Sequence, residues 1–392
     1  MKAMKTKITL MAIAALMITA CSEKEVSPDT PYMIEGELTG VRDSLLIRLV
    51  RWENSLGETI DRDTIINGHF MFKGTSDEGL RQLTLSVYDE EFPSMSRVVY
   101  VAPGAHVKVK GSDTYIATWD VESSLDEQRV FDEIHFAAKD DMFAYQKTFI
   151  EYYKAMNVYH PEERAKGLAD ADRARKLNQQ MDSILNIMET KRIGKMKLMK
   201  PSAAWLDELA QMARMVDKTP VYGKHKAEIK AMYNAIPDEM KQGEKAQLTH
   251  AYLNPPKRAK VGDDFPESDF YDLQGNLHHI SEFKGKYILL DFWSRGCGPC
   301  IASFPKMKEL YEEEDGRLAI ISLNIDTDKH WRIASERLEI TWNNWNELKG
   351  HAGLYANYNI TAIPFYVLIN PEGKIQEIMR GFSKQYIQEA MK

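Results

Sequence analysis

Two cysteines near residue 300 carry the clearest chemistry in this sequence. Cys297 and Cys300 stand in the tetrapeptide Cys-Gly-Pro-Cys, the spacing of a redox pair. The largely apolar residues 287–293 predict a buried strand, and residues 298–314 predict a helix. A cysteine at a helix start faces unpaired backbone N–H groups and the positive end of the helix dipole, and both favour its thiolate. We therefore expect Cys297 to be the nucleophile and Cys300, one turn inside the helix, to be the shielded resolving thiol.

The amino-terminal residues predict export and a lipid anchor. Lysines precede an apolar run over residues 8–20, which is too short to span a bilayer comfortably. An ordinary secretory cleavage site is the alternative, but it fits poorly because Ile18 stands where a small side chain is needed. The segment resembles the lipobox of bacterial lipoproteins, which implies a signal peptide over residues 1–20 and a lipid on Cys21, followed by a polar linker over 21–31. We expect a lipid-anchored protein of the bacterial cell envelope, facing the periplasm or on the outer membrane.

The cysteine count supports a working pair over a structural bridge. The chain has three cysteines, and lipid on Cys21 would leave Cys297 and Cys300 alone. Zinc would need further ligands, but there is no second cysteine pair and His278-His279 lacks the usual spacing. Haem attachment would need a histidine where Ile301 stands. We predict no metal and no cofactor beyond a redox-active Cys297–Cys300 disulfide.

Composition narrows the class of protein. With 392 residues the chain should form two or three domains. Its 44% hydrophobic and 28% charged residues are typical of a globular protein. The net charge of -7, without a basic stripe, argues against a nucleic-acid partner.

The pattern changes twice along the chain. Short β segments between turns predict an all-β, sandwich-like domain over residues 32–120, with a hairpin at Asn67-Gly68 and with Trp52, Phe70 and Tyr100 in its core. Helical periodicity follows over 121–254, where the many methionines are expected to be packing material. Asn254-Pro255-Pro256 marks a boundary, and alternating strands and helices over 255–392 predict an α/β domain with antiparallel final strands.

The last domain resembles the TlpA/ResA group of membrane-tethered thioredoxins. The similarity covers about residues 257–392. It rests on the Cys-Gly-Pro-Cys string after its strand, on Asn324-Ile325-Asp326, on Ile363-Pro364-Phe365 and on the Val261–Pro266 lead-in. The β segments are similar to the small domain of unassigned function that often precedes such modules in exported lipoproteins.

This resemblance implies an α/β thioredoxin-like fold and a thiol–disulfide oxidoreductase. Its substrates would be disulfides of exported proteins, and a membrane electron donor would supply the reducing power. Pro364 would be a cis proline beside the disulfide, and the backbone of Ile363 would pair with an extended substrate. The remaining substrate-binding candidates are Trp293, Gly298 and Pro299.

Asp291 is the third catalytic candidate. It lies six residues before Cys297 in an otherwise apolar strand, where thioredoxin has its buried aspartate. Burial raises a carboxyl pKa, so this group could accept the Cys300 proton. A strand-end carboxylate bonded to backbone is the alternative interpretation.

The sequence also departs from its relatives. Gly296 stands where a tryptophan usually precedes the first cysteine, Ser303 where TlpA/ResA proteins often have a glutamate, and Ser322 where thioredoxin has a lysine. A thiol peroxidase is an alternative, since Ser294 precedes Cys297 by three residues as in peroxiredoxins, but Leu290 replaces their proline. A non-catalytic, ligand-binding lipoprotein is the second alternative.

Overall fold

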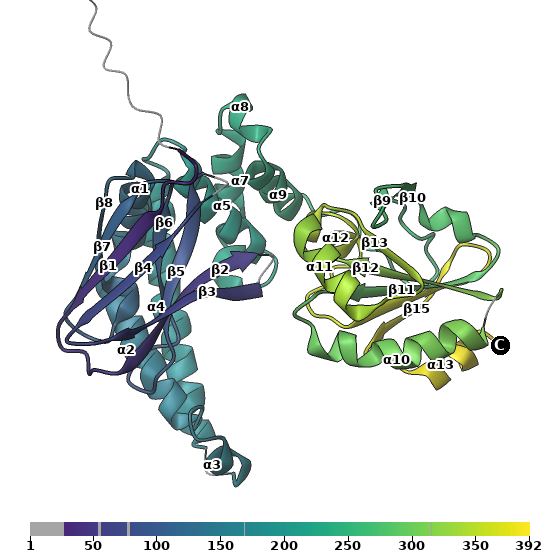
Figure 1. Ribbon diagram of the computed structural model, residues 1–392, viewed down its shortest axis with the longest axis horizontal. Coiled ribbons are helices and arrows are strands. Elements are labelled where there is room, and N and C mark those ends of the chain that lie inside the picture. The colour runs from purple at the N-terminus through teal and green to yellow at the C-terminus, as the bar shows by residue number, and fades with distance from the viewer. Residues whose placement is uncertain (1–26, 54–55, 77–78, 168, 315) are drawn as a thin grey trace, which may run out of the picture.

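The computed structural model describes residues 27–53, 56–76, 79–167, 169–314 and 316–392. A β sandwich with packed helices forms one part, and an α/β domain forms the other (Figure 1). The predicted signal peptide and Cys21 lie outside the described residues. Among the helices that are described, none has both the length and the apolar character needed to cross a membrane.

The amino-terminal part is a sandwich of two four-stranded sheets, with strand orders β4-β1-β7-β8 and β3-β2-β5-β6. Alternate side chains of both sheets fill the shared core, as period-two patterning predicts. The strands are β1 Tyr32–Leu38, β2 Leu45–Glu53, β3 Leu56–Ile65, β4 His69–Gly74, β5 Arg81–Val87, β6 Ser96–Val101, β7 His106–Gly111 and β8 Asp120–Ser123, and a short 3-10 helix, η1 Ile116–Thr118, precedes β8.

The turn at Asn67-Gly68 forms, but it does not join paired strands of one sheet. Ile66 and His69 exchange backbone hydrogen bonds of 3.1 and 3.0 Å across it. Beyond this bridge β3 pairs with β2 and β4 pairs with β1, so the chain passes from one sheet to the other. The predicted hairpin is therefore a corner of the sandwich.

Gly36 in β1 faces Phe70 in β4 across their antiparallel pairing. The Phe70 ring occupies the space where a β-carbon on Gly36 would lie. Phe70 lies in the sandwich core as predicted, whereas Tyr100 is buried against Phe131 and Ala204 of the helices, and Trp52 is 58% exposed. Trp52 lies on the β2–β3 hairpin, outside the core, and its ring covers Gly57 on the neighbouring strand.

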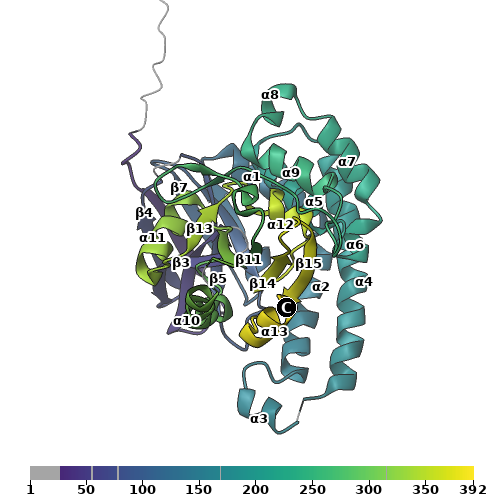
Figure 2. The same cartoon turned by 90° about the vertical axis from the view of Figure 1, so that its right-hand side faces the viewer.

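The middle of the chain folds into helices beside the sandwich (Figures 1 and 2). Methionines share their largest core with Trp205 and other apolar side chains, which agrees with the packing role predicted for them. The helices are α1 Asp126–His135, η2 Phe136–Ala138, α2 Lys139–Ala155, α3 Pro161–Ala165, α4 Ala171–Met196, α5 Ala203–Met215, α6 Pro220–Gly223, α7 Lys226–Asn234, α8 Asp238–Lys241 and α9 Glu244–Leu253.

The α/β domain has a seven-stranded sheet in the order β10-β9-β13-β12-β11-β14-β15. Strands β11, β12 and β13 are parallel, while β14 and β15 are antiparallel, as predicted for the last two strands. The elements are β9 Phe270–Tyr271, β10 Leu277–His278, η3 Ile280–Phe283, β11 Tyr287–Trp293, α10 Gly298–Glu313, β12 Leu318–Asn324, α11 Asp328–Leu338, β13 Asn343–Asn346, η4 Gly350–Ala352, α12 Leu354–Asn357, β14 Phe365–Ile369, β15 Ile375–Arg380 and α13 Lys384–Ala390.

Alternation along β11 decides what faces each side of this sheet. Leu289 and Trp293 pack with α10, α11 and α13, and Ile288 and Phe292 pack with α12 on the opposite side. Asp291 shares the parity of Leu289 and Trp293 and so lies on the α10 side. The fold is thus the predicted thioredoxin-like α/β domain after a β domain and helices.

Candidate active site

The site begins where β11 ends and α10 starts. Cys297 is the residue that caps α10, and Pro299 lies in the first turn, where its missing N–H costs no hydrogen bond. The Cys297 sulfur accepts the Cys300 N–H at 3.2 Å. The two cysteines form a disulfide with their Cα atoms 5.3 Å apart. A thiolate at Cys297 would therefore meet backbone donors already in place.

The two sulfurs differ in access. Cys297 is 8% exposed, whereas Cys300 is fully buried. Gly298 and Pro299, between them, are exposed. The Cys300 sulfur lies 4.0 Å from the Phe292 carbonyl oxygen, on the inner side of the helix. A reagent from solvent therefore reaches Cys297 first.

The predicted substrate-binding residues divide into two groups. The Ile363-Pro364 peptide bond is cis, and Ile363 packs against the apolar cluster that contains both cysteines. Ile363 and Pro364 are half-buried, so both keep some surface beside the pair.

Trp293 lies in the predicted buried strand, away from the surface where a substrate would bind. It is fully buried and packs edge-on against Phe304 of α10, with ring centroids 5.4 Å apart. Its side chain supports α10 from below and offers no surface to a substrate.

Asp291 lies fully buried under α10. The Ser322 hydroxyl donates to its Oδ2 at 2.7 Å. The other oxygen, Oδ1, has no hydrogen bond of ordinary geometry in the described part of the chain. Burial raises the pKa of Asp291 to about 7, against smaller opposing effects of the Ser322 and Tyr366 hydroxyls. This carboxyl can therefore exchange a proton near neutral pH.

Ser303 and Ser322, the two serines at which the sequence departs from its relatives, both lie in the buried polar group around Asp291. Ser322, at the position of the thioredoxin lysine, donates to Asp291 and accepts the Trp342 indole N–H at 2.8 Å. Ser303 bonds the Cys300 carbonyl at 2.6 Å and the Tyr366 hydroxyl at 2.9 Å. The replacements thus leave Asp291 with neutral partners, which agrees with its raised pKa.

The loop before Cys297 is held by Asp326, a residue of the Asn324-Ile325-Asp326 string. Its carboxylate accepts the Arg295 backbone N–H at 2.7 Å and the Asn324 amide at 3.1 Å. Asn346, on the short strand β13, donates to the Asp326 carbonyl at 2.8 Å. Asp326 therefore fixes the backbone that carries the first cysteine.

Sequence reasoning missed one contributor to this site. Glu58 lies on β3, in the β domain, and its carboxylate is 3.5 Å from the Arg295 guanidinium. The two residues are 237 positions apart, so no local spacing could have linked them.

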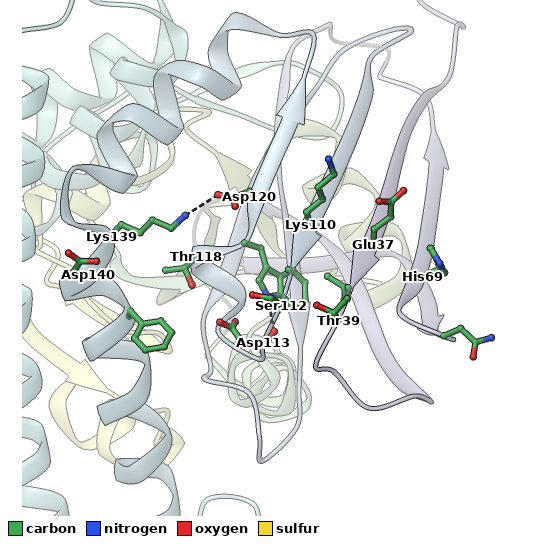
Figure 3. Close-up of a pocket in the computed structure, with 15 residues that line it drawn as sticks. Glu37, Thr39, His69, Lys110, Ser112, Asp113, Thr118, Asp120, Lys139 and Asp140 are labelled. Atoms are coloured by element: carbon green, nitrogen blue, oxygen red, sulfur yellow. Dashed lines mark hydrogen bonds and ion pairs between the residues drawn. The ribbon is translucent and has the colours of Figure 1, made fainter.

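A cavity of about 660 Å³ lies between the β domain and α2. Figure 3 shows polar side chains of β1, β7 and α2 around it, with Lys139 paired to Asp120 at 2.9 Å. Trp119 and Phe143 add aromatic surface to its lining. Among the described residues, no group of three histidine, cysteine, aspartate or glutamate side chains is placed to hold a metal ion.

Comparison with known proteins finds relatives of the carboxyl-terminal domain. Residues 260–390 match the family model described as Redoxin. The chain is 28% identical over 124 residues to the thioredoxin-like protein YneN of Bacillus subtilis, covering 31% of this chain and 71% of YneN. It is also 28% identical over 148 residues to the thiol-disulfide oxidoreductase ResA of Bacillus cereus, covering 37% of this chain and 84% of ResA. These matches support a ResA-like family for this domain.

The thioredoxin domain of a thiol-disulfide oxidoreductase from Bacteroides vulgatus is 28% identical and has a TM-score of 0.32. The alignment covers 34% of this chain and 99% of that domain.

Proposed function

We propose that this protein is a thiol–disulfide oxidoreductase that reduces disulfides of exported proteins through Cys297 and Cys300. The observation that carries the proposal is the disulfide at the start of α10, in which Cys297 retains some exposed surface and Cys300 retains none. The similarity to ResA and YneN supports the same chemistry.

The reaction moves two electrons. The Cys297 thiolate attacks one substrate sulfur, so a Cys297–substrate bond forms, the substrate disulfide breaks and its other sulfur leaves as a thiolate. Cys300 then gives its proton to Asp291 and attacks the Cys297 sulfur, which forms the Cys297–Cys300 disulfide and releases the second substrate thiolate. The substrate is reduced and the pair is oxidised. Electrons held in the cysteine pair make a bound cofactor unnecessary.

Turnover requires a reductant that returns two electrons to the pair. For an exported protein this donor would be a membrane protein whose own dithiol is oxidised in exchange. A lipid on Cys21 would hold the domain at the same membrane. The net charge of -7 argues against a nucleic-acid partner.

Cysteine variants of the full-length protein test this function. Cys297→Ser should abolish reduction of a model protein disulfide in the presence of a dithiol reductant. Cys300→Ser should accumulate mixed disulfides, which mass spectrometry of trapped proteins can identify. Cys21→Ser is the matched control, since it should keep turnover and lose membrane attachment. Wild-type protein that reduces hydrogen peroxide but no protein disulfide would be a thiol peroxidase instead.

The cavity between the β domain and α2 favours a second candidate, a ligand-binding function. Its polar lining with the aromatic residues Trp119 and Phe143 suits a polar ligand such as a glycan or peptide. Serine at both Cys297 and Cys300 would leave such binding intact. If the double variant retains the protein's whole biological effect, ligand binding is the function and the redox proposal fails.

A further inference from the structure

The β domain contributes to the surface beside the redox pair. A cavity of about 400 Å³ lies where the β2–β3 hairpin meets the redox domain. Gly57 and Glu58 of the hairpin line one side, and Arg295 and Gly296, which directly precede Cys297, line another. The remaining lining residues are His330, Ile333, Ala334 and Arg337 of α11.

The hairpin reaches this place because β2 and β3 extend from the sandwich toward the redox domain (Figure 1). Glu58 contacts two elements there, Arg295 at 3.5 Å and His330 at 3.9 Å. Since Asp326 fixes the Arg295 backbone, the hairpin meets an anchored part of the site.

The four α11 residues that line the cavity lie on one face of that helix. Residues 330, 333, 334 and 337 are spaced by three and four, so they form one helix face. Arg332 belongs to a different face, where it bonds Asp328 at 2.9 Å and does not line the cavity.

Positive charge predominates in the cavity. Its one carboxylate, on Glu58, is already bonded to Arg51 across the hairpin at 2.8 Å, a closer contact than the one to Arg295. Arg337 is exposed and has no ion pair with the residues that the structure describes. Arg295 is partly compensated by Glu58 and by the nearby Asp326 carboxylate, so Arg337 is the cavity guanidinium that has no carboxylate partner among the described residues.

Apolar surface borders the same cavity. Ile333 is 57% exposed and Trp52, which covers Gly57, is 58% exposed. Gly296 places no side chain between the cavity and Cys297. A polypeptide crossing from Cys297 to the cavity would cover this apolar surface and bring its own side chains to the arginines.

We propose that this cavity is a specificity subsite for a carboxylate that the substrate carries beside its disulfide, with the β domain forming one wall. The proposal rests on the disulfide-reducing function given above. Arginine suits this task because its planar donors match a carboxylate. The favoured substrate is thus a protein segment with aspartate or glutamate next to the reacting cysteine.

Three disulfide peptides test the subsite with the full-length protein. They differ only in carrying Glu, Gln or Lys beside the cysteine. The wild-type kcat/KM should be roughly tenfold higher for the Glu peptide than for the Gln peptide, the factor expected of one charge-assisted contact, and lowest for Lys. Arg337→Gln should bring the Glu-to-Gln ratio toward one. Glu58→Gln should raise this ratio, because it removes a competing carboxylate.

Arg332→Gln is the matched control, with the same substitution on another face of α11, and it should keep the wild-type ratio. Equal kcat/KM for the Glu and Gln peptides, or an equal loss of preference in Arg332→Gln and Arg337→Gln, would overturn the subsite. Titration calorimetry with serine analogues of the peptides separates this result from failed redox chemistry. If no peptide is reduced, the proposed function fails, and tighter binding of the Glu analogue supports the subsite while equal binding overturns it.

Discussion

The Ser322 hydroxyl donates a 2.7 Å hydrogen bond to the Asp291 carboxylate in the buried layer between β11, β12 and α10. The same hydroxyl accepts the Trp342 indole N–H at 2.8 Å. Ser322 and Trp342 are both neutral, so neither supplies a positive charge to offset the cost of burying the Asp291 charge. The raised pKa of Asp291, about 7, follows from this arrangement.

Asp291→Asn should slow disulfide turnover on the order of 10²-fold, because the variant cannot accept the Cys300 proton. It should leave the first step, attack by Cys297, intact. In the wild type, turnover should rise with pH around 7, where Asp291 becomes ionised. The measurement is the pH profile of turnover beside the alkylation rate of Cys297.

Ser322→Ala provides the comparison for that profile. Its hydroxyl lowers the pKa of Asp291, so its loss should move the inflection to higher pH. Wild-type rates across pH in Asp291→Asn, or an unmoved inflection in Ser322→Ala, would show that Asp291 is not the proton carrier.

The unfolding free energy of the oxidised protein should also depend on pH because of the raised pKa of Asp291. The pKa of Asp291 is about 7 in the folded state against 3.8 for the free side chain, so the folded state holds the proton more tightly. The stability that this tighter proton binding contributes to the folded state is fully present below pH 4. It is lost as pH rises toward and through 7, where the buried carboxyl must ionise. The difference between the folded-state and free-side-chain pKa values corresponds to about 4 kcal/mol of unfolding free energy as an upper bound.

Asp291→Asn removes this titration. The advantage of the variant over the wild type in urea unfolding should therefore grow between pH 4 and pH 8. A difference that stays constant over this interval would mean that the folded protein does not hold Asp291 with a raised pKa.

Alkylation should distinguish the two cysteines. In the reduced protein at mildly acidic pH, iodoacetamide should label Cys297 before Cys300, because Cys297 caps α10 and retains exposed surface while Cys300 is fully buried. Peptide mapping by mass spectrometry gives the order. Preferential labelling of Cys300 would reverse the roles assigned to the pair.

The potential of the pair should be that of a reductant. Gly-Pro between the cysteines resembles thioredoxin, whose potential is roughly -270 mV. Equilibration with glutathione buffers measures this value. A potential near the -120 mV of a strong oxidant would make the protein a disulfide donor.

The sequence predicted most of the redox domain because its signals are local. Strand 287–293 and its continuation into a helix follow from apolar residues and from Gly-Pro after a capping cysteine. Strand β13 could not be predicted in this way, since Asn343–Asn346 is mostly polar and is defined by its pairing with β12. Its asparagines serve hydrogen bonds, as Asn346 does to Asp326.

The two tryptophan predictions that differ from the structure have a common physical cause. The sequence predicts that Trp293 binds substrate and that Trp52 lies in the sandwich core, but Trp293 is fully buried and Trp52 is 58% exposed. A tryptophan's type and local pattern do not show whether a helix covers it, as α10 covers Trp293, or whether its hairpin leaves the sandwich. The contact between Glu58 and Arg295 has the same origin, because it depends on how two domains meet.

Gly36 and Phe70 bear on how the β domain can change in evolution. Since the Phe70 ring occupies the place of a Gly36 side chain, any larger residue at position 36 requires a smaller one at position 70. A smaller residue at 70 alone would leave a cavity in the core. The two positions should therefore vary together among descendants of this gene, and such covariation would mark the β1–β4 pairing in sequences that retain little other similarity.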